Sequence, residues 1–254
     1  MSKEALKIKD LCKNFSGLSV LKDLSLIVWP RERVAIIGPN GAGKTTLLNV
    51  ISGELPSSSG QVYVFGQEIS TMPTHERIHL GIGRSFQLNH LFINLSVLEN
   101  VLLSLHGIRP SRYQILKKMT DFKEPLVKAN NILKSLNLWD KKDDPIHTLS
   151  YGEQRKMEIA LSIASEPKIL LLDEPSAGLA MAEVPPFINM IESLSEDTTV
   201  LFSAHDMDVV FGLADRVVVL YYGQIIAQGT YEVIQADSKV REIYLGIEDR
   251  AADA

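Results

Sequence analysis

Short and nearly continuous apolar runs predict three buried strands in this chain. They are Arg33–Ile37, Ile169–Leu172 and Thr199–Ser203, and all three are rich in Val, Ile and Leu. A strand that is apolar on both faces is typical of a parallel sheet covered by helices on both sides. The runs therefore predict an α/β core with a mainly parallel sheet.

Other segments alternate or cluster apolar residues around turns. Leu6–Asp10, Leu24–Val28 and Gln61–Phe65 have this pattern, which is typical of antiparallel strands joined by short connections. We expect these segments to form an antiparallel sheet that lies against the parallel core.

A helical period replaces the strand pattern in the middle of the chain. Val97–Leu105 and Leu126–Leu138 have helical apolar spacing, and Pro110, Pro125 and the polar stretch 140–145 separate them. This pattern predicts a helical subdomain inserted into the core.

The predicted organisation is one unit over residues 1–254 with three parts. Residues 1–87 and 160–235 are expected to form the core with the antiparallel sheet, and residues 88–159 the helical subdomain. Residues 236–254 are expected to form a C-terminal helix and a frayed tail.

Residues 38–45 read GPNGAGKT and fit the pattern G-x-x-x-x-G-K-[ST] between a predicted strand and a predicted helix. Glycines let several backbone N–H groups converge on one anion, and the following helix adds its positive end. Lys44 supplies a charge for the β- and γ-phosphates, and the Thr45 hydroxyl suits a Mg²⁺ shell. The alternative interpretation is an ordinary glycine-rich turn.

Two acidic residues follow the buried run 169–172. Asp173 and Glu174 stand where open α/β sheets bind ligands, at the carboxyl end of a strand. Asp173 is assigned to the Mg²⁺ sphere, and Glu174 is assigned to orienting or deprotonating the water that attacks a γ-phosphate. The alternative interpretation is an acidic helix N-terminus favoured by the helix dipole.

His205 follows the third buried strand and is a candidate γ-phosphate sensor through a neutral imidazole. A lone histidine is more often a surface or satisfied core residue, and that interpretation is kept for the rest: His75, His79, His90, His106 and His147. Gln87 ends a short strand pattern and can ligate Mg²⁺ through its amide oxygen.

Residues 149–154 read LSYGEQ and open an amphipathic stretch. Ser150 with Glu153 three residues later is a capping-box pattern, and Met157, Ala160 and Leu161 recur behind it at helical spacing. The amino end of this helix is a candidate anion site. The alternative is a helix cap with no further role.

Composition limits the remaining function classes. The formal charge of −5 does not provide the excess of positive charge that is typical of nucleic-acid-binding proteins. The single cysteine, Cys12, forms no intrachain disulfide and fits a reducing compartment. No apolar run approaches the roughly 20 residues that cross a bilayer, and residues 1–7 lack a signal-peptide core. We expect a protein of cytosolic character that reaches a membrane only through partner proteins.

Taken in order, these motifs resemble the nucleotide-binding subunit of ABC transporters along essentially the whole chain. The resemblance implies a P-loop NTPase fold with an antiparallel β subdomain and an inserted helical subdomain, ATP and Mg²⁺ as cofactors, and ATP hydrolysis. It also implies head-to-tail pairing, in which each ATP lies between one subunit's phosphate loop and the other subunit's signature segment.

The implied site residues fall into four groups. The catalytic group is Lys44, Glu174 and His205, and the metal group is Thr45, Gln87 and Asp173. The ATP-binding group is Phe15, Gly38, Pro39, Asn40, Gly41, Ala42, Gly43, Lys44, Thr45, Thr46 and Gln87, with Phe15 stacked on adenine. The signature group, facing the partner's ATP, is Ser150, Tyr151, Gly152, Glu153 and Gln154.

One residue departs from the family pattern. Many members carry Asp after Ser-Ala-Gly-Leu in the loop that crosses the dimer interface, whereas this chain has Ala180. Alanine lacks the acidic side chain that would form an inter-subunit hydrogen bond there, and hydrolysis is expected to survive the change.

Within the family, three stretches are similar to the ATPases of bacterial importers for branched-chain amino acids and for urea: residues 81–87, 149–159 and 243–246. The implied partners are a second ABC ATPase subunit, identical or paralogous, permease subunits in the membrane and a periplasmic or extracellular solute-binding protein, with no nucleic acid. The implied location is the cytoplasmic face of the inner or plasma membrane. Two alternatives stay open: a soluble ABC ATPase acting on DNA or ribosomes, and a nucleotide-gated regulatory module with low turnover.

Overall fold

The computed structural model describes residues 3–85, 91–107, 122–192 and 197–243. Its main sheet has six strands in the order β10-β9-β3-β8-β7-β6. The five strands from β9 to β6 run parallel, and β10 pairs antiparallel with β9. The strands are β3 (Arg33–Ile37), β6 (Ile82–Arg84), β7 (Ile169–Asp173), β8 (Thr199–Ser203), β9 (Arg216–Tyr221) and β10 (Gln224–Gly229).

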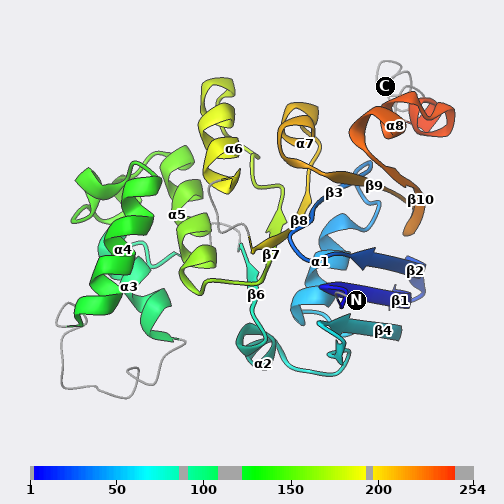
Figure 1. The fold of residues 1–254 in the computed structure, drawn as a ribbon, viewed down its shortest axis with the longest axis horizontal. Helices are drawn as coiled ribbons and strands as arrows, with labels where there is room; N and C mark the ends of the chain where they lie inside the picture. The colour runs from blue at the N-terminus through cyan, green and yellow to red at the C-terminus, as the bar shows by residue number, and fades with distance from the viewer. Residues whose placement is uncertain (1–2, 86–90, 108–121, 193–196, 244–254) are drawn as a thin grey trace.

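A second sheet of four strands lies beside the first (Figure 1) and has the order β2-β1-β4-β5, with every pair antiparallel. Its strands are β1 (Leu6–Phe15), β2 (Leu18–Val28), β4 (Ser59–Val64) and β5 (Gln67–Glu68). A two-residue turn joins β1 to β2, so these long strands form a hairpin at one edge of the sheet.

The strands of the main sheet place alternate residues on two cores. In β3, Val34 and Ile36 belong to the cluster shared with the antiparallel sheet and with α1 (Lys44–Ser52). Ala35 and Ile37 point to the other face and join a larger cluster built with helices. This two-residue period explains why the strand sequence is apolar without interruption.

The larger cluster includes three helices that gather at one end of the molecule, drawn in green in Figure 1: α3 (Val97–Gly107), α4 (Lys123–Ser135) and α5 (Tyr151–Ala164). The remaining helices are α2 (Thr74–His79), α6 (Val184–Glu192), α7 (Met207–Leu213) and α8 (Tyr231–Ala236). Short 3₁₀ turns are η4 (Trp139–Lys141), η5 (Ile146–Thr148) and η6 (Met181–Glu183), and residues 238–243 are helical. Among the described residues, no helix combines the length and apolar character needed to span a membrane.

The predicted α/β class, the three buried strands, the antiparallel sheet and the helix after the phosphate loop are confirmed. The division into subdomains stays a prediction, and the single helix α5 runs through its boundary at residues 159 and 160. Pro110 and the distal tail lie outside the described residues.

The predicted helix Leu126–Leu138 is wrong at both ends. It begins at Lys123, so Pro125 lies in its first turn rather than before it. A proline is tolerated there because a first-turn N–H has no partner inside the helix. The helix ends at Ser135, and Asn137 has a φ of 56°, a left-handed conformation that stops the helix.

Arg77 of α2 closes the carboxyl end of α1. Its Nη1 donates to the carbonyl oxygens of Val50 (2.7 Å) and Ile51 (2.8 Å), and its Nε donates to that of Met72 (2.8 Å). The residue is 3% exposed, and burial lowers the pKa of its guanidinium. A cation at this end of α1 satisfies carbonyls that have no helical partner and complements the helix dipole.

We expect Arg77→Met to lower the free energy of unfolding by about 2–4 kcal/mol, because charged hydrogen bonds are lost and buried carbonyls are left unpaired. Urea unfolding without nucleotide measures the loss. Arg31→Met is the matched control, since Arg31 pairs with Asp197 at the surface, where both side chains are more than half exposed. Its cost should stay below about 1 kcal/mol. Equal losses in the two variants would contradict this account of Arg77.

Candidate active site

The phosphate loop connects the end of β3 at Ile37 to the start of α1 at Lys44. Two of its glycines are required by close contacts. A Cβ on Gly38 would lie 2.1 Å from the carbonyl oxygen of Leu220, and one on Gly43 would lie 2.9 Å from Cδ2 of Leu21. Their φ values of 152° and 107° add a second reason for glycine. The loop is therefore held against β2 and β9 by backbone that only glycine permits.

Lys44 lies inside this loop. Its Nζ donates to the carbonyl oxygens of Gly38 (2.7 Å) and Pro39 (3.3 Å), and the residue is 7% exposed. Burial lowers the pKa of the ammonium, and the carboxylates of Glu174 and Asp173 offset part of that shift. A cation that has lost much of its water gains by binding an anion, which is the property a phosphate site needs.

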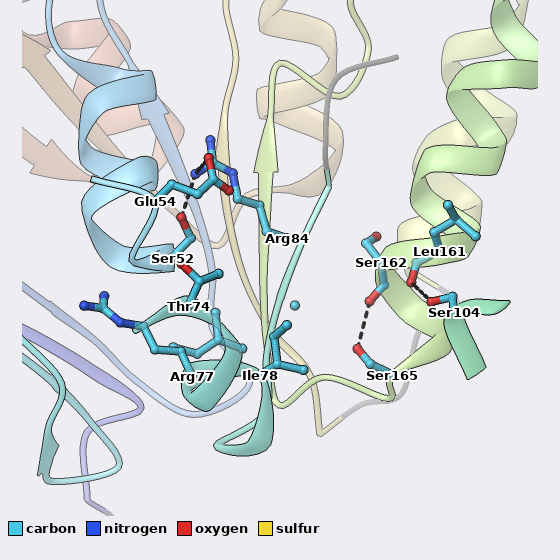
Figure 2. Close-up of a pocket in the computed structure, with 12 residues that line it drawn as sticks. Ser52, Glu54, Thr74, Arg77, Ile78, Arg84, Ser104, Leu161, Ser162 and Ser165 are labelled. Atoms are coloured by element: carbon cyan, nitrogen blue, oxygen red, sulfur yellow. Dashed lines mark hydrogen bonds and ion pairs between the residues drawn. The ribbon is translucent and has the colours of Figure 1, made fainter. Parts of the chain in front are cut away.

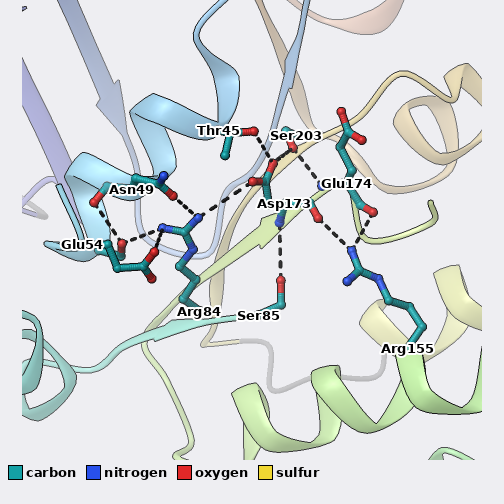
Figure 3. A network of polar contacts seen from close by, with 10 residues as sticks. Thr45, Asn49, Glu54, Arg84, Ser85, Arg155, Asp173, Glu174 and Ser203 are labelled. Carbon is teal, nitrogen blue, oxygen red and sulfur yellow. Dashed lines mark hydrogen bonds and ion pairs between the residues drawn. The ribbon is translucent and has the colours of Figure 1, made fainter. Parts of the chain in front are cut away.

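Thr45 in the first turn of α1 meets Asp173 at the carboxyl end of β7 (Figure 3). The Thr45 hydroxyl donates to Asp173 Oδ1 at 3.3 Å, and the Ser203 hydroxyl donates to the same oxygen at 2.6 Å. Asp173 is 8% exposed. Hydroxyl and carboxylate oxygens are the donors that Mg²⁺ prefers, and Mg²⁺ commonly takes one or two protein ligands beside phosphate oxygens and water. Thr45 and Asp173 fit that requirement.

Arg84 of β6 holds the other side of Asp173. Its Nη2 lies 3.9 Å from Asp173 Oδ2 and donates to Asn49, while its Nη1 lies 3.3 Å from Glu54 Oε2 and donates to Ser52 Oγ at 2.7 Å. Burial lowers the pKa of the Arg84 guanidinium, and the charges of Glu54 and Asp173 act against that shift. The side chain is thus tied to α1 and β7 together, as Figure 3 shows.

Glu174 has a φ of 45°, a conformation that a residue with a long side chain adopts only at a cost. The backbone there is held from two sides. Its N–H donates to Ser203 Oγ at 2.9 Å, and Arg155 Nη2 donates to the carbonyl oxygens of Asp173 and Glu174, each at 2.8 Å. Arg155 Nε donates in addition to the Pro175 carbonyl at 3.3 Å. These bonds fix the direction of the Glu174 side chain.

His205 lies beside that side chain. Its Nδ1 is 3.4 Å from Glu174 Oε1, and the imidazole is 61% exposed. The structure thus brings together the predicted carboxylate and the predicted histidine in the segments that follow two neighbouring strands, β7 and β8. An exposed imidazole at this position is accessible to a phosphate or a water molecule.

The signature segment forms the capping box that its sequence predicts. The Glu153 N–H donates to Ser150 Oγ at 3.3 Å, and the Ser150 N–H donates to Glu153 Oε2 at 3.0 Å. Lys141 Nζ lies 2.7 Å from Glu153 Oε1, and Gln154 Nε2 donates to the Leu149 carbonyl at 3.0 Å. Burial acts to raise the pKa of Glu153, but hydrogen bonds from Lys141 and Ser150 bring it below its usual value.

Two predicted site residues are not joined to this group. Phe15 ends β1, is 42% exposed and has Lys13 Nζ 4.8 Å from its ring centroid, so its role with adenine stays a prediction. Gln87 lies outside the described residues. Pro39, Asn40, Gly41, Ala42 and Thr46 lie where the sequence places them, in the loop and the first turn of α1.

The sequence interpretation missed four residues that hold this site: Arg84, Arg155, Ser203 and Ser85, whose Oγ accepts from the Asp173 N–H at 3.4 Å. Ser203 carried a usable signal, because it is a polar residue at the end of a buried strand. Arg84 and Arg155 are adjacent to recognised motifs, but a pattern of residues does not show which carbonyl or carboxylate an arginine reaches.

Comparison with known proteins connects this geometry to a family. The ABC transporter family model matches residues 21–177, and a model described as branched-chain amino acid ATP-binding cassette transporter matches residues 224–250. The chain is 34% identical to the high-affinity branched-chain amino acid transport ATP-binding protein LivG of Escherichia coli K12, over 97% of this chain and 99% of that protein. It is also 34% identical to the lipopolysaccharide export system ATP-binding protein LptB of Haemophilus influenzae, over 95% and 97%.

Solved structures give the same result. The ADP conformation of MJ1267, an ATP-binding cassette of an ABC transporter, matches with a TM-score of 0.84 and 34% identity, over 96% of this chain and 99% of that one. The dimeric structure of MJ0796, a bacterial ABC transporter cassette, matches with a TM-score of 0.78 and 26% identity, over 89% and 98%.

We expect Ser203→Ala to lower triphosphate turnover about tenfold while triphosphate binding changes little. The variant removes one bond to Asp173 and leaves the Glu174 N–H unpaired, at a cost of about 1–3 kcal/mol in the positioning of these residues. Single-turnover hydrolysis and nucleotide titration separate the two effects.

Ser162→Ala is the control, because Ser162 is another buried serine whose hydroxyl donates to a carbonyl, that of Ile159, within α5. Turnover in Ser203→Ala equal to that of this control would remove Ser203 from the site.

Proposed function

This chain belongs to the ATP-binding subunits of ABC transporters. We propose that its ATP hydrolysis drives an importer for branched-chain amino acids or a related small solute. The observation that carries the proposal is the contact between Thr45 and Asp173 at 3.3 Å, with Lys44 beside Thr45 and Glu174 beside Asp173. That contact supports a site at one edge of one sheet in which Lys44 binds phosphate, Thr45 and Asp173 bind Mg²⁺ and Glu174 is the base.

Each residue has a role in this proposal. The phosphate loop would bind the triphosphate, Lys44 would stabilise charge on the β- and γ-phosphates, and Thr45, Asp173 and Gln87 would hold Mg²⁺. Glu174 orients or deprotonates the attacking water, and His205 contacts the γ-phosphate or that water. Phe15 stacks on adenine. When bound, Mg²⁺ neutralises charge that develops between the phosphates.

The proposal includes a second cassette. Ser150 and Gly152 stand at the amino end of α5, where backbone N–H groups favour an anion, and we assign them to the γ-phosphate of the partner's ATP. Tyr151, Glu153 and Gln154 complete that surface. The dimeric structure of the similar cassette MJ0796 supports pairing of this kind.

One finding favours the import of branched-chain amino acids over other transport functions. Identity alone does not separate LivG from LptB, since both are 34% identical to this chain. The match at residues 224–250 is to a branched-chain amino acid cassette model and favours that branch. The proposed partners are permease subunits and an external solute-binding protein, which place the chain at the cytoplasmic face of the membrane.

The two alternatives from the sequence are less well supported. The two relatives described above, LivG and LptB, are transport proteins, so they do not favour an ATPase that acts on DNA or ribosomes. A regulatory module with low turnover does not need the complete set of Lys44, Asp173, Glu174 and His205.

A cleft between the core and the helical end is the proposed contact for the permease (Figure 2). Its walls come from α1 and α2 on one side and from α3 and α5 on the other, with Thr74, Ile78, Ser104 and Ser165 among the lining residues. Arg84 also lines it and reaches Asp173 from there. A permease segment seated in this cleft would therefore contact a residue that touches the Mg²⁺ ligand.

We expect Glu174→Gln to reduce ATP turnover about a hundredfold or more, because the base is lost, while the ATP-bound dimer accumulates. Lys44→Ala should instead bind ATP weakly and form little dimer. Size-exclusion chromatography with ATP, together with phosphate release, distinguishes the two. The exposed Glu166→Gln is the control and should turn over like wild type; equal turnover in Glu174→Gln would remove Glu174 from its role.

We expect Ile78→Asp to release the permease without loss of ATP turnover by the free chain. Ile78 lines the cleft and is 37% exposed, so a charge there opposes an apolar contact without unfolding the core. The measurement is copurification of permease subunits from solubilised membranes, followed by leucine and urea uptake into vesicles. Phe211→Asp, at an exposed position of α7, is the control. Full copurification with Ile78→Asp would exclude the cleft as the docking site.

A further inference from the structure

The segment that follows Glu174 is attached to the signature helix α5 at several points. We call residues 175–180 the interface loop. Arg155 of α5 binds the start of this loop, because its Nε donates to the Pro175 carbonyl at 3.3 Å. Tyr151 of α5 covers its middle, where a Cβ on Gly178 would lie 2.2 Å from Tyr151 Cε1. Gly178 has a φ of 80°, so both space and backbone require glycine there.

The third attachment involves Glu183 in η6. Its Oε2 accepts a hydrogen bond from the Ala180 N–H at 3.0 Å. The same carboxylate lies on Gly152 of α5, where a Cβ would meet Glu183 Oε1 at 2.7 Å and Oε2 at 2.9 Å. One half-buried carboxylate therefore contacts the end of the interface loop and the glycine of the signature segment.

Because residue 180 is alanine, the position of the loop end depends more strongly on the Glu183 carboxylate. Ala180 occupies the cap position of η6, and an alanine methyl group cannot accept the hydrogen bond that a Ser, Asp or Asn side chain accepts there. Only the reciprocal half of a capping box is formed, from Glu183 to the Ala180 N–H. The position of the loop end thus depends on a side chain that also touches Gly152.

We propose that Glu183 is a positioning residue that couples the two nucleotide sites of this chain. Its carboxylate holds the interface loop against the signature segment. Binding of the partner's ATP at Ser150 and Gly152 therefore sets the position of Glu174 in this chain. The inference rests on the proposed function, because it requires the head-to-tail dimer. Glu174 is sensitive to this coupling because its strained backbone lies directly before the interface loop. Arg155 also donates hydrogen bonds both to the Glu174 carbonyl and to the first carbonyl of the loop.

The test compares Glu183→Ala with Glu183→Gln in the full chain. Glu183→Ala should lower ATP turnover about tenfold and bring the Hill coefficient for ATP close to one, because the sites no longer depend on each other. The ATP concentration at half-saturation should change less than about twofold. Glu183→Gln keeps an oxygen that accepts from the Ala180 N–H and should restore both quantities.

Two further measurements separate positioning from a structural role. In the Glu174→Gln background, Glu183→Ala should trap the ATP-bound dimer with the same yield as the parent. Glu232→Ala is the matched control, because Glu232 is a carboxylate in the first turn of α8, away from the signature. Thermal melts of all variants establish that they fold.

Wild-type turnover and cooperativity in Glu183→Ala would overturn the inference alone. A loss of dimer as large as the loss of turnover, a failure of Glu183→Gln to rescue, or an equal effect of Glu232→Ala would also overturn it. A wild-type chain that neither dimerises with ATP nor hydrolyses it would overturn the proposed function and the inference together.

Discussion

The buried carboxylate of Asp173 is the interaction on which the site depends. It accepts hydrogen bonds from hydroxyl groups on α1 and β8, and it lies near a guanidinium on β6. Four elements that are far apart in the sequence thus meet at one oxygen-rich point, three strands by their carboxyl ends and α1 by its amino end. A buried charge is costly unless it is paired and hydrogen-bonded, so this carboxylate restricts the position of every element that touches it. The same restriction keeps the phosphate loop and the candidate base in a fixed relation.

The backbone after Asp173 shows how that precision is maintained. Glu174 occupies a left-handed conformation, and bonds from Ser203 and Arg155 stabilise it from opposite sides. Arg155 belongs to the helix whose amino end carries the signature segment, and its own charge is balanced by the buried Glu158. The strained backbone of this candidate base is therefore stabilised by hydrogen bonds from β8 and α5.

Local patterns in the sequence predicted much of this arrangement, because their causes are local. Continuous apolar runs gave the buried strands, and the spacing of Ser150 and Glu153 predicted a capping box that the structure contains. The predicted ends of α4 were wrong for two reasons. Proline is acceptable in the first turn of a helix, and Asn137 adopts a left-handed conformation that stops one. Arg84 and Ser203 were missed because their partner Asp173 lies on another strand. A sequence pattern does not show that residues as distant in sequence as Arg84 and Asp173 are in contact.

The helix α1 has a mechanical consequence beyond ligand binding. It begins at the phosphate loop and ends under the guanidinium of Arg77, which α2 supplies and which also lines the cleft. The nine residues of α1 form a rigid helix about 13 Å long. A rigid helix moves along its axis as one unit, with little bending. A displacement of α2 at the cleft would therefore shift α1 as a whole and so move the phosphate loop. A movement of the phosphate loop would be transmitted through α1 and α2 to a segment bound in the cleft.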